Sequence, residues 1–216
     1  WNLYDLLDPL LKGIVPASAI GDLLDGEGAR FPKNSLRLRF NTNHDKNAWD
    51  APAVVKFGRE GVALTAVLCA TLPGIPLLYT GEEVANDRTL SLFEKVAVDW
   101  SRPREMETLY TTLFRLRREH KALSSGDWMR ISTSHEDRIF ASLRTEGKDR
   151  ALCLLNFSLD TLSADLVLPP GEMTGKGRND LLLQEAFTGS TLAVSPGRPV
   201  KVVLPPRGYR IYVPAR

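Results

Sequence analysis

Two strand-like runs organise the first part of the chain, at residues 36–40 and 75–79. In the first run, leucine and phenylalanine alternate with arginine, and this period of two predicts a strand. Polar residues follow both runs, with Asn43, His44 and Asp45 after the first and Tyr79 and Glu82 at the end of the second. In an α/β barrel the loops after the strands build the active-site face, so we expect chemistry at these two ends.

Helical patterns flank and separate the two runs. Apolar residues at helical spacing predict helices over residues 1–11, 61–72 and 105–123, and Pro16 to Ser18 could open a further short helix. Residues 25–34 and 43–58 are polar and broken by proline, which predicts loops. Strand, helix and strand in this order form a parallel crossover unit.

The remainder of the chain is expected to be antiparallel. Short strand-like runs are separated by clusters of Gly, Pro, Asp and Asn, as in a β-sandwich, and Ser124 to Asp127 marks the boundary before them. The expected strands are residues 128–132, 138–145, 150–157, 164–168, 180–183, 201–204 and 209–213.

Two motifs carry a resemblance to a known family. The residues from Phe40 to Asp45 match F-x-x-N-H-D at every fixed position, and the residues from Gly74 to Glu83 match G-x-P-x-x-Y-x-G-x-E. These patterns resemble the ends of the seventh and eighth barrel strands of the α-amylase superfamily, glycoside hydrolase family 13. The resemblance extends over nearly the whole chain, including Phe93-Glu94-Lys95, and is looser after Asp127.

The resemblance implies an α/β plus all-β fold: the C-terminal portion of a (β/α)8 TIM barrel over residues 1–124 and an antiparallel β-sandwich domain over residues 125–216. A complete barrel takes roughly 250 residues. We therefore expect the chain to be a fragment. In the family, the nucleophile and the acid come from the fourth and fifth strands, and nothing before Leu36 resembles either motif. Both groups are expected upstream of Trp1, and the chain alone is expected to be inactive.

The implied function of the parent protein is retaining hydrolysis of α-1,4-glucans or maltooligosaccharides. Asp45 corresponds to the family's third carboxylate, which would stabilise the oxocarbenium-like transition state, and His44 would donate to the same sugar hydroxyls. Without the surrounding motif, such a His-Asp pair is more often an ordinary loop pair. The alternative function is a non-catalytic, amylase-like binding or scaffold protein, against which the intact cluster argues.

The other candidate substrate-binding residues each have a structural alternative. Asn43 is either a ligand or a turn former. Trp49, in a polar segment, is suited to stacking on a sugar ring, whereas for Tyr79 core packing is the stronger alternative. Glu82 could line the cleft or cap the following segment. Of the arginines, Arg37 and Arg39 suggest charge pairing inside the barrel, and those at 115, 117 and 118 suggest a solvated helix face.

Composition narrows the range of partners. Hydrophobic residues at 43% and charged residues at 25% are ordinary for a globular protein, and the net charge of +2 favours neither nucleic acid nor a membrane surface. No apolar run approaches the length of a membrane span. The expected partners are an α-glucan and either the missing barrel half or a second copy.

Cys69 and Cys153 are expected to be buried thiols. No metal site or cofactor is evident, calcium in the parent protein is left open, and so is the compartment (secreted, periplasmic or cytoplasmic).

Overall fold

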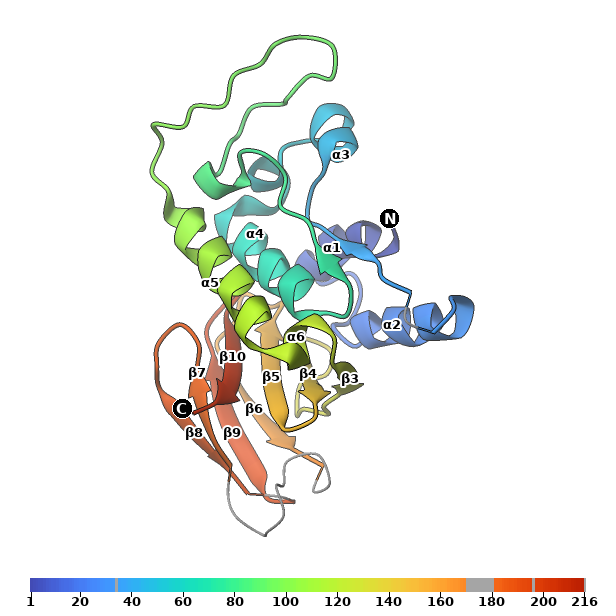
Figure 1. Cartoon of the computed structure of the whole chain (residues 1–216), viewed down its shortest axis with the longest axis vertical. Coiled ribbons are helices and arrows are strands. Elements are labelled where there is room, and N and C mark those ends of the chain that lie inside the picture. The colour runs from blue at the N-terminus through green and yellow to red at the C-terminus, as the bar shows by residue number, and fades with distance from the viewer. Residues whose placement is uncertain (34, 170–180, 196, 216) are drawn as a thin grey trace.

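The computed structural model describes residues 1–33, 35–169, 181–195 and 197–215. Helices and two short strands form the first part, and an antiparallel β-structure forms the second (Figure 1). The first part contains α1 (Asn2–Leu11), α2 (Ala19–Arg30), β1 (Leu38–Arg39), α3 (His44–Trp49), α4 (Ala53–Thr71), β2 (Ile75–Pro76), the 3-10 helix η1 (Glu82–Val84), α5 (Glu105–Glu119) and α6 (Lys121–Ser124). The second part contains β3 (Asp127–Arg130), β4 (Ile139–Glu146), β5 (Asp149–Asn156), β6 (Leu162–Val167), β7 (Leu181–Glu185), β8 (Thr191–Val194), β9 (Pro199–Leu204) and β10 (Tyr209–Pro214).

The predictions of loops over residues 25–34 and 43–58 are wrong for most of these residues, which are helical in the structure. Residues 25–30 belong to α2, because Ile20 and Leu24 lie one turn apart and are both buried, and this packing outweighs the low helix propensity of the glycines that follow. Residues 43–58 contain α3 and the start of α4. Local capping explains this, since Asn43 caps α3 and Pro52 precedes the first turn of α4.

The predicted parallel crossover is confirmed, with shorter strands than expected. β1 pairs in parallel with β2, and their register places Leu38 opposite Ile75. The described residues give each strand one neighbour only, so few ladder hydrogen bonds form. Gly74 is needed at the entry to β2, because its φ is +124° and a Cβ there would lie 2.4 Å from the Arg37 carbonyl oxygen.

Two antiparallel sheets form the second part, as predicted. The larger sheet has the strand order β3-β4-β5-β10-β7-β8, and β6 pairs with β9 in the smaller one. A hydrophobic cluster that includes Leu143, Leu152 and Leu204 fills the space between them. The short strand β8 escaped prediction because it lies among glycine and serine. Residue 180, the expected start of β7, lies outside the described residues.

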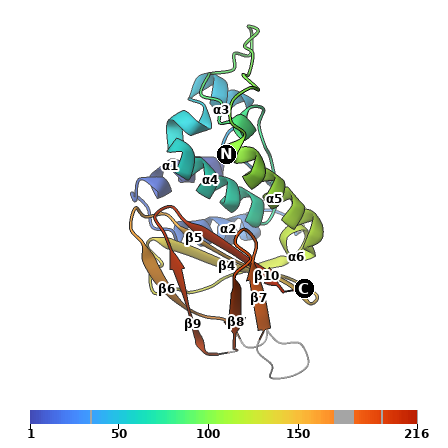
Figure 2. The ribbon, with the colours of Figure 1, turned by 90° about the vertical axis from the view of Figure 1, so that its left-hand side faces the viewer.

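The central strand of the larger sheet is buried on both faces. Leu152 and Leu154 of β5 belong to the cluster inside the sandwich, whereas Ala151, Cys153 and Leu155 belong to the cluster formed with the helices. This explains the unbroken apolar run along β5, since alternate residues face different cores. α4 contacts β5, and the helices lie over this end of the sheet (Figure 2). The hydrophobic core therefore continues across the boundary predicted at residue 124, and that boundary stays a prediction.

Three arginines converge on the carbonyl groups at the end of α4. We call these groups the α4 carbonyl cluster, and it consists of the main-chain oxygens of Ala70, Thr71, Pro73 and Gly74. Arg144 of β4 donates to Thr71 at 2.8 Å, and also to the Gly126 and Asp127 carbonyls. Helices leave their last carbonyls without intrahelical partners, and a positive charge there is favourable.

The other two arginines approach the cluster from α5 and β1. Arg117 of α5 donates to the Ala70 and Gly74 carbonyls at 2.8 and 2.7 Å, so its predicted place on a solvated face is wrong. Arg39 donates to the Pro73 carbonyl at 2.8 Å and pairs with Glu27 of α2 through two hydrogen bonds. Arg39 therefore forms the predicted charge pairing, and its partner Glu27 lies on the helix α2. Burial lowers the pKa of Arg144 to about 10 and also lowers that of Arg117.

We predict that Arg144→Met lowers the free energy of unfolding by about 3 kcal/mol, because two buried carbonyl groups and one partly buried carbonyl group lose their donor and methionine supplies none. Chemical denaturation measures the change. Arg118→Ala, on the exposed face of α5, is the matched control and is expected to stay within about 0.5 kcal/mol of the unmodified chain. Equal effects of the two substitutions would contradict this role of Arg144.

Candidate functional site

The parallel pairing of β1 and β2 brings the ends of the two sequence motifs together. Thr42, two residues before His44, and Tyr79 and Glu82, after β2, line the same small pocket. Asn47 of α3 and Asn86, which follows η1, complete its polar lining. Sequence reasoning did not single out Thr42, Asn47 or Asn86, because isolated Asn and Thr residues carry no periodic or motif signal.

Asn43 fixes where the first motif turns from strand to helix. Asn43 is buried and its backbone is extended. Its Oδ1 atom accepts a hydrogen bond from the Lys46 amide at 2.9 Å. This is the geometry of a helix N-cap. The side-chain oxygen of Asn43 therefore stabilises the turn, which is the structural alternative to substrate binding. A contact between its amide nitrogen and substrate stays a prediction.

His44 and Asp45 occupy the first turn of α3 and remain accessible. The His44 Nε2 atom lies 3.4 Å from the Asp45 Oδ1 atom, and the side chains are 62% and 43% exposed. An imidazole beside a carboxylate provides a hydrogen-bond donor and an acceptor within one site. Their exposure leaves both groups available to a ligand that carries hydroxyl groups.

Trp49 lies at the other end of α3 and is 70% exposed. Its ring contacts that of Phe93 edge-on, with 6.2 Å between the ring centroids. Phe93 belongs to the segment between η1 and α5, which runs as a long loop beyond α3 (Figure 1). The Asn47 Oδ1 atom accepts a hydrogen bond from the Leu90 amide at 2.6 Å and thereby joins α3 to this loop.

Glu82 is buried, and Tyr79 is half-buried beside it. The Glu82 Oε2 atom accepts a hydrogen bond from the Tyr79 amide at 2.9 Å, so this carboxylate holds the turn that follows β2. Burial raises the pKa of Glu82 to about 8, and the nearby Glu83 charge adds to the rise. The Glu82 carboxyl group thus acts as a cap, and the stacking of Tyr79 and the contact of Glu82 with substrate stay predictions.

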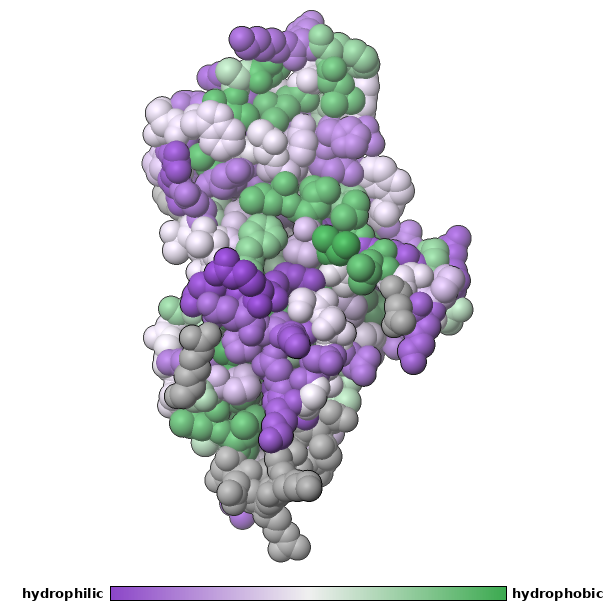
Figure 3. Space-filling model, viewed as in Figure 1, coloured by the Kyte–Doolittle hydropathy of each residue, from purple (hydrophilic) through white to green (hydrophobic). Residues whose placement is uncertain are grey.

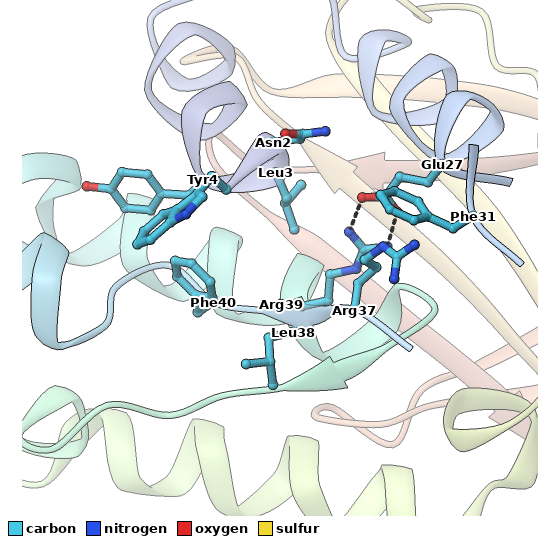
Figure 4. A pocket seen from close by; sticks show the side chains of 10 residues that line it. Asn2, Leu3, Tyr4, Glu27, Phe31, Arg37, Leu38, Arg39 and Phe40 are labelled. Carbon is cyan, nitrogen blue, oxygen red and sulfur yellow. Dashed lines mark hydrogen bonds and ion pairs between the residues drawn. The ribbon is translucent and has the colours of Figure 1, made fainter. Parts of the chain in front are cut away.

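A second pocket lies on the other side of β1, between β1, α1 and α2. Figure 4 shows its lining, in which Arg39 and Glu27 are joined by two hydrogen bonds and Tyr4 and Phe40 lie along one wall. The residues predicted for catalysis and substrate binding do not line it. Arg39 and Glu27 satisfy each other, and a third charged residue of the lining, Arg37, stacks on the Phe31 ring.

An apolar band crosses the face that carries β1 and β2 (Figure 3). Leu36, Leu38 and Ile75 are 62%, 57% and 47% exposed, and the pairing of Leu38 with Ile75 places both on one face of the strand pair. Exposed apolar surface of this kind marks a contact surface.

The described residues show no metal cluster, two buried thiols and no helix that could span a membrane. The described residues contain no group of three or more His, Cys, Asp or Glu side chains that could hold a metal ion. Cys69 and Cys153 are free and buried, as predicted, and burial raises the pKa of the Cys153 thiol to about 12. Within the described residues, no helix combines the length and the apolarity that crossing a bilayer requires.

Comparison with known sequences finds amylases and related enzymes. The chain is 29% identical over 157 residues to the α-amylase MalA of Haloarcula japonica, covering 69% of this chain and 22% of that protein. It is 26% identical over 218 residues to a cyclomaltodextrinase of Geobacillus thermopakistaniensis, covering 97% of this chain and 35% of that protein. The chain thus spans about a quarter to a third of the length of the curated relatives it matches. No protein-family model matches it.

Solved structures show the same fold. The structure superposes on a maltogenic α-amylase from Thermotoga neapolitana with a TM-score of 0.80 at 21% identity, over 97% of this chain and 48% of that one. An Anoxybacillus α-amylase gives the same TM-score at 18% identity, over 100% and 46%. The chain is therefore similar in sequence to α-amylases and cyclomaltodextrinases, and it has the fold of the C-terminal portion of a (β/α)8 barrel followed by an antiparallel β-sandwich.

Proposed function

We propose that this chain is the C-terminal part of a retaining glycoside hydrolase that acts on α-1,4-glucans or maltooligosaccharides. The observation that carries the proposal is the accessible Asp45 carboxylate with His44 beside it, in the first turn of α3, the helix that follows β1. The relatives are named as amylases and cyclomaltodextrinases. Solved neighbours include an α-amylase in complex with acarbose and a protein in complex with maltotriose.

In this proposal Asp45 acts on the transition state. As the glycosidic bond breaks, positive charge develops on the sugar ring, and its hydroxyl groups become stronger hydrogen-bond donors to a fixed carboxylate. His44 donates to the same hydroxyls and keeps the ring oriented. The nucleophile and the acid would come from a segment outside this chain. They would be about 5 Å apart, as retention of configuration requires.

We also propose that a further chain covers the apolar band of Leu36, Leu38 and Ile75. The rest of a barrel would cover these residues, because the strands on either side of β1 and β2 would pair with the free edges and fill the interior. A second copy of this chain is the other occupant. Analytical ultracentrifugation of the chain, alone and with the rest of the barrel, distinguishes the two.

We predict that Asp45→Asn, made in a longer protein that carries this chain, lowers kcat on a maltooligosaccharide by roughly 10³-fold, because an interaction made mainly in the transition state is lost. Thermal unfolding is expected to be unchanged. Asp165→Asn is the matched control, since Asp165 is an exposed carboxylate of β6 with a comparable exposed fraction. Near-normal kcat in the Asp45 variant would exclude the assigned role.

The chain by itself is predicted to give no turnover of starch, because the proposed nucleophile and acid are not among its residues. A reducing-sugar assay on the purified chain measures this, with a complete α-amylase as the positive control. Clear hydrolysis that follows the chain through purification would show that the two carboxylates are misassigned.

We predict that Glu82 makes the fold less stable as the pH rises. Its pKa of about 8 in the folded chain exceeds the ordinary value of 4.5, so the folded state binds the proton more tightly. This contribution is therefore fully present below about pH 4.5 and is lost as the pH rises to about 8, with a slope of up to about 1.4 kcal/mol per pH unit. Denaturation at a series of pH values is expected to show this slope in the unmodified chain and not in Glu82→Gln. Glu83→Gln removes the nearby charge that adds to the rise, so it should retain the slope but end it at a somewhat lower pH. A slope that survives in Glu82→Gln would refute the prediction.

A further inference from the structure

Two aromatic rings stand exposed side by side near the candidate site. Phe93 is 82% exposed, the highest value among the large hydrophobic residues that the structure describes, and its neighbour Trp49 is 70% exposed. Their rings are inclined by 62° to each other. Each ring leaves most of its surface to solvent although burial would stabilise the chain, so this pair contributes little to the core.

Hydrogen bonds hold the backbone of the loop that carries Phe93 beside α3, the helix that carries Trp49. Buried Asn47 of α3 binds the Leu90 amide of the loop, two residues before Leu92. The Ser91 Oγ atom accepts hydrogen bonds from the Phe93 and Glu94 amides, both at 3.1 Å, which fixes the turn that carries the Phe93 ring. Rings positioned by such contacts lose little conformational freedom on binding.

The loop that carries Phe93 is also fastened at its far end. Arg102 forms two hydrogen bonds of 2.9 Å with the Asp87 carboxylate and a longer one with the Ala85 carbonyl. The segment from Asp87 to Arg102 is therefore closed at its base, and it extends as a long loop beyond α3 (Figure 1).

The position of the pair matches the proposed substrate. Trp49 follows His44 by five residues on α3, which corresponds to about 7.5 Å along the helix axis. A sugar bound at His44 and Asp45 could therefore continue toward the rings. A glucose ring has apolar faces and hydroxyl groups at its edge, so it stacks on an aromatic ring and leaves its hydroxyls to water or to polar side chains.

We propose that Trp49 and Phe93 form a two-ring platform that binds a glucose unit of an α-glucan beyond the one held at His44 and Asp45. The platform rests on the proposed function and extends it, because it adds Phe93 as a binding residue and makes a longer oligosaccharide bind better than a short one. Neither ring takes part in bond breaking.

The test is a titration of the chain with maltoheptaose, followed by NMR of its indole N–H groups. The chain has four tryptophans, so the signal of Trp49 can be assigned by substitution. We expect the Trp49 signal to shift to saturation while that of Trp100, an exposed residue of the same loop, stays unchanged. Cellohexaose, a β-linked glucan, is the ligand control and is expected to bind more weakly.

Substitutions of Phe93 separate ring stacking from simple apolar contact. Phe93→Leu keeps an apolar side chain and is expected to weaken maltoheptaose binding roughly two- to tenfold, whereas Phe93→Tyr is expected to restore it. Trp100→Ala is the matched control and should bind as the unmodified chain does. Circular dichroism checks that each variant is folded.

Four results would overturn the platform. The first is that maltoheptaose does not shift the Trp49 signal, and the second is that Phe93→Leu binds maltoheptaose as tightly as the unmodified chain does. The third is that cellohexaose binds as tightly as maltoheptaose. The fourth is that the Trp49 signal shifts with protein concentration in the absence of sugar. The last would mean that a second copy covers the rings. None of these results affects the Asp45 experiment, so a failed platform and a failed proposed function are distinguishable.

Discussion

Arginine side chains from three separate elements cap the end of α4. The end of this helix presents four main-chain oxygens, and Arg39, Arg117 and Arg144 donate to them from β1, α5 and β4. Buried carbonyl groups without partners would be costly, and these donors come from three separate parts of the chain. One helix end thereby joins the parallel strands, the last barrel helix and the antiparallel sheet.

This junction also determines where the candidate site forms. β2 begins directly after the α4 carbonyl cluster, and Gly74 lets its backbone come close to Arg37. The parallel register of β1 and β2 then places Thr42 beside Tyr79 and Glu82. The position of His44 and Asp45 is thus a consequence of packing at the opposite end of the strands, through the rigid crossover between them.

Sequence reasoning predicted the architecture better than the contacts. The period-two runs and the two motifs predicted the parallel pair, the sandwich and the similarity to α-amylases, because these depend on local patterns. The role of Arg117 was predicted wrongly, since an arginine on a helix gives no sign that its head reaches the carbonyl groups of another helix. α3 was missed because its six residues are too few to show a period. The exposure of Phe93 could not be predicted, because it depends on how a loop without periodicity folds.

The helices and the larger sheet form one cooperative unit that is joined at the end of α4. Their shared hydrophobic cluster contains Leu68 of α4 and Cys153 of β5. Native-state hydrogen exchange of the amides in α4 and β5 tests this most directly. In a single cooperative unit, both groups of amides exchange with the same free energy of opening and the same dependence on denaturant. If the α4 amides exchanged at a much lower free energy while those of β5 remained protected, the helical part would open independently and the claim would be contradicted.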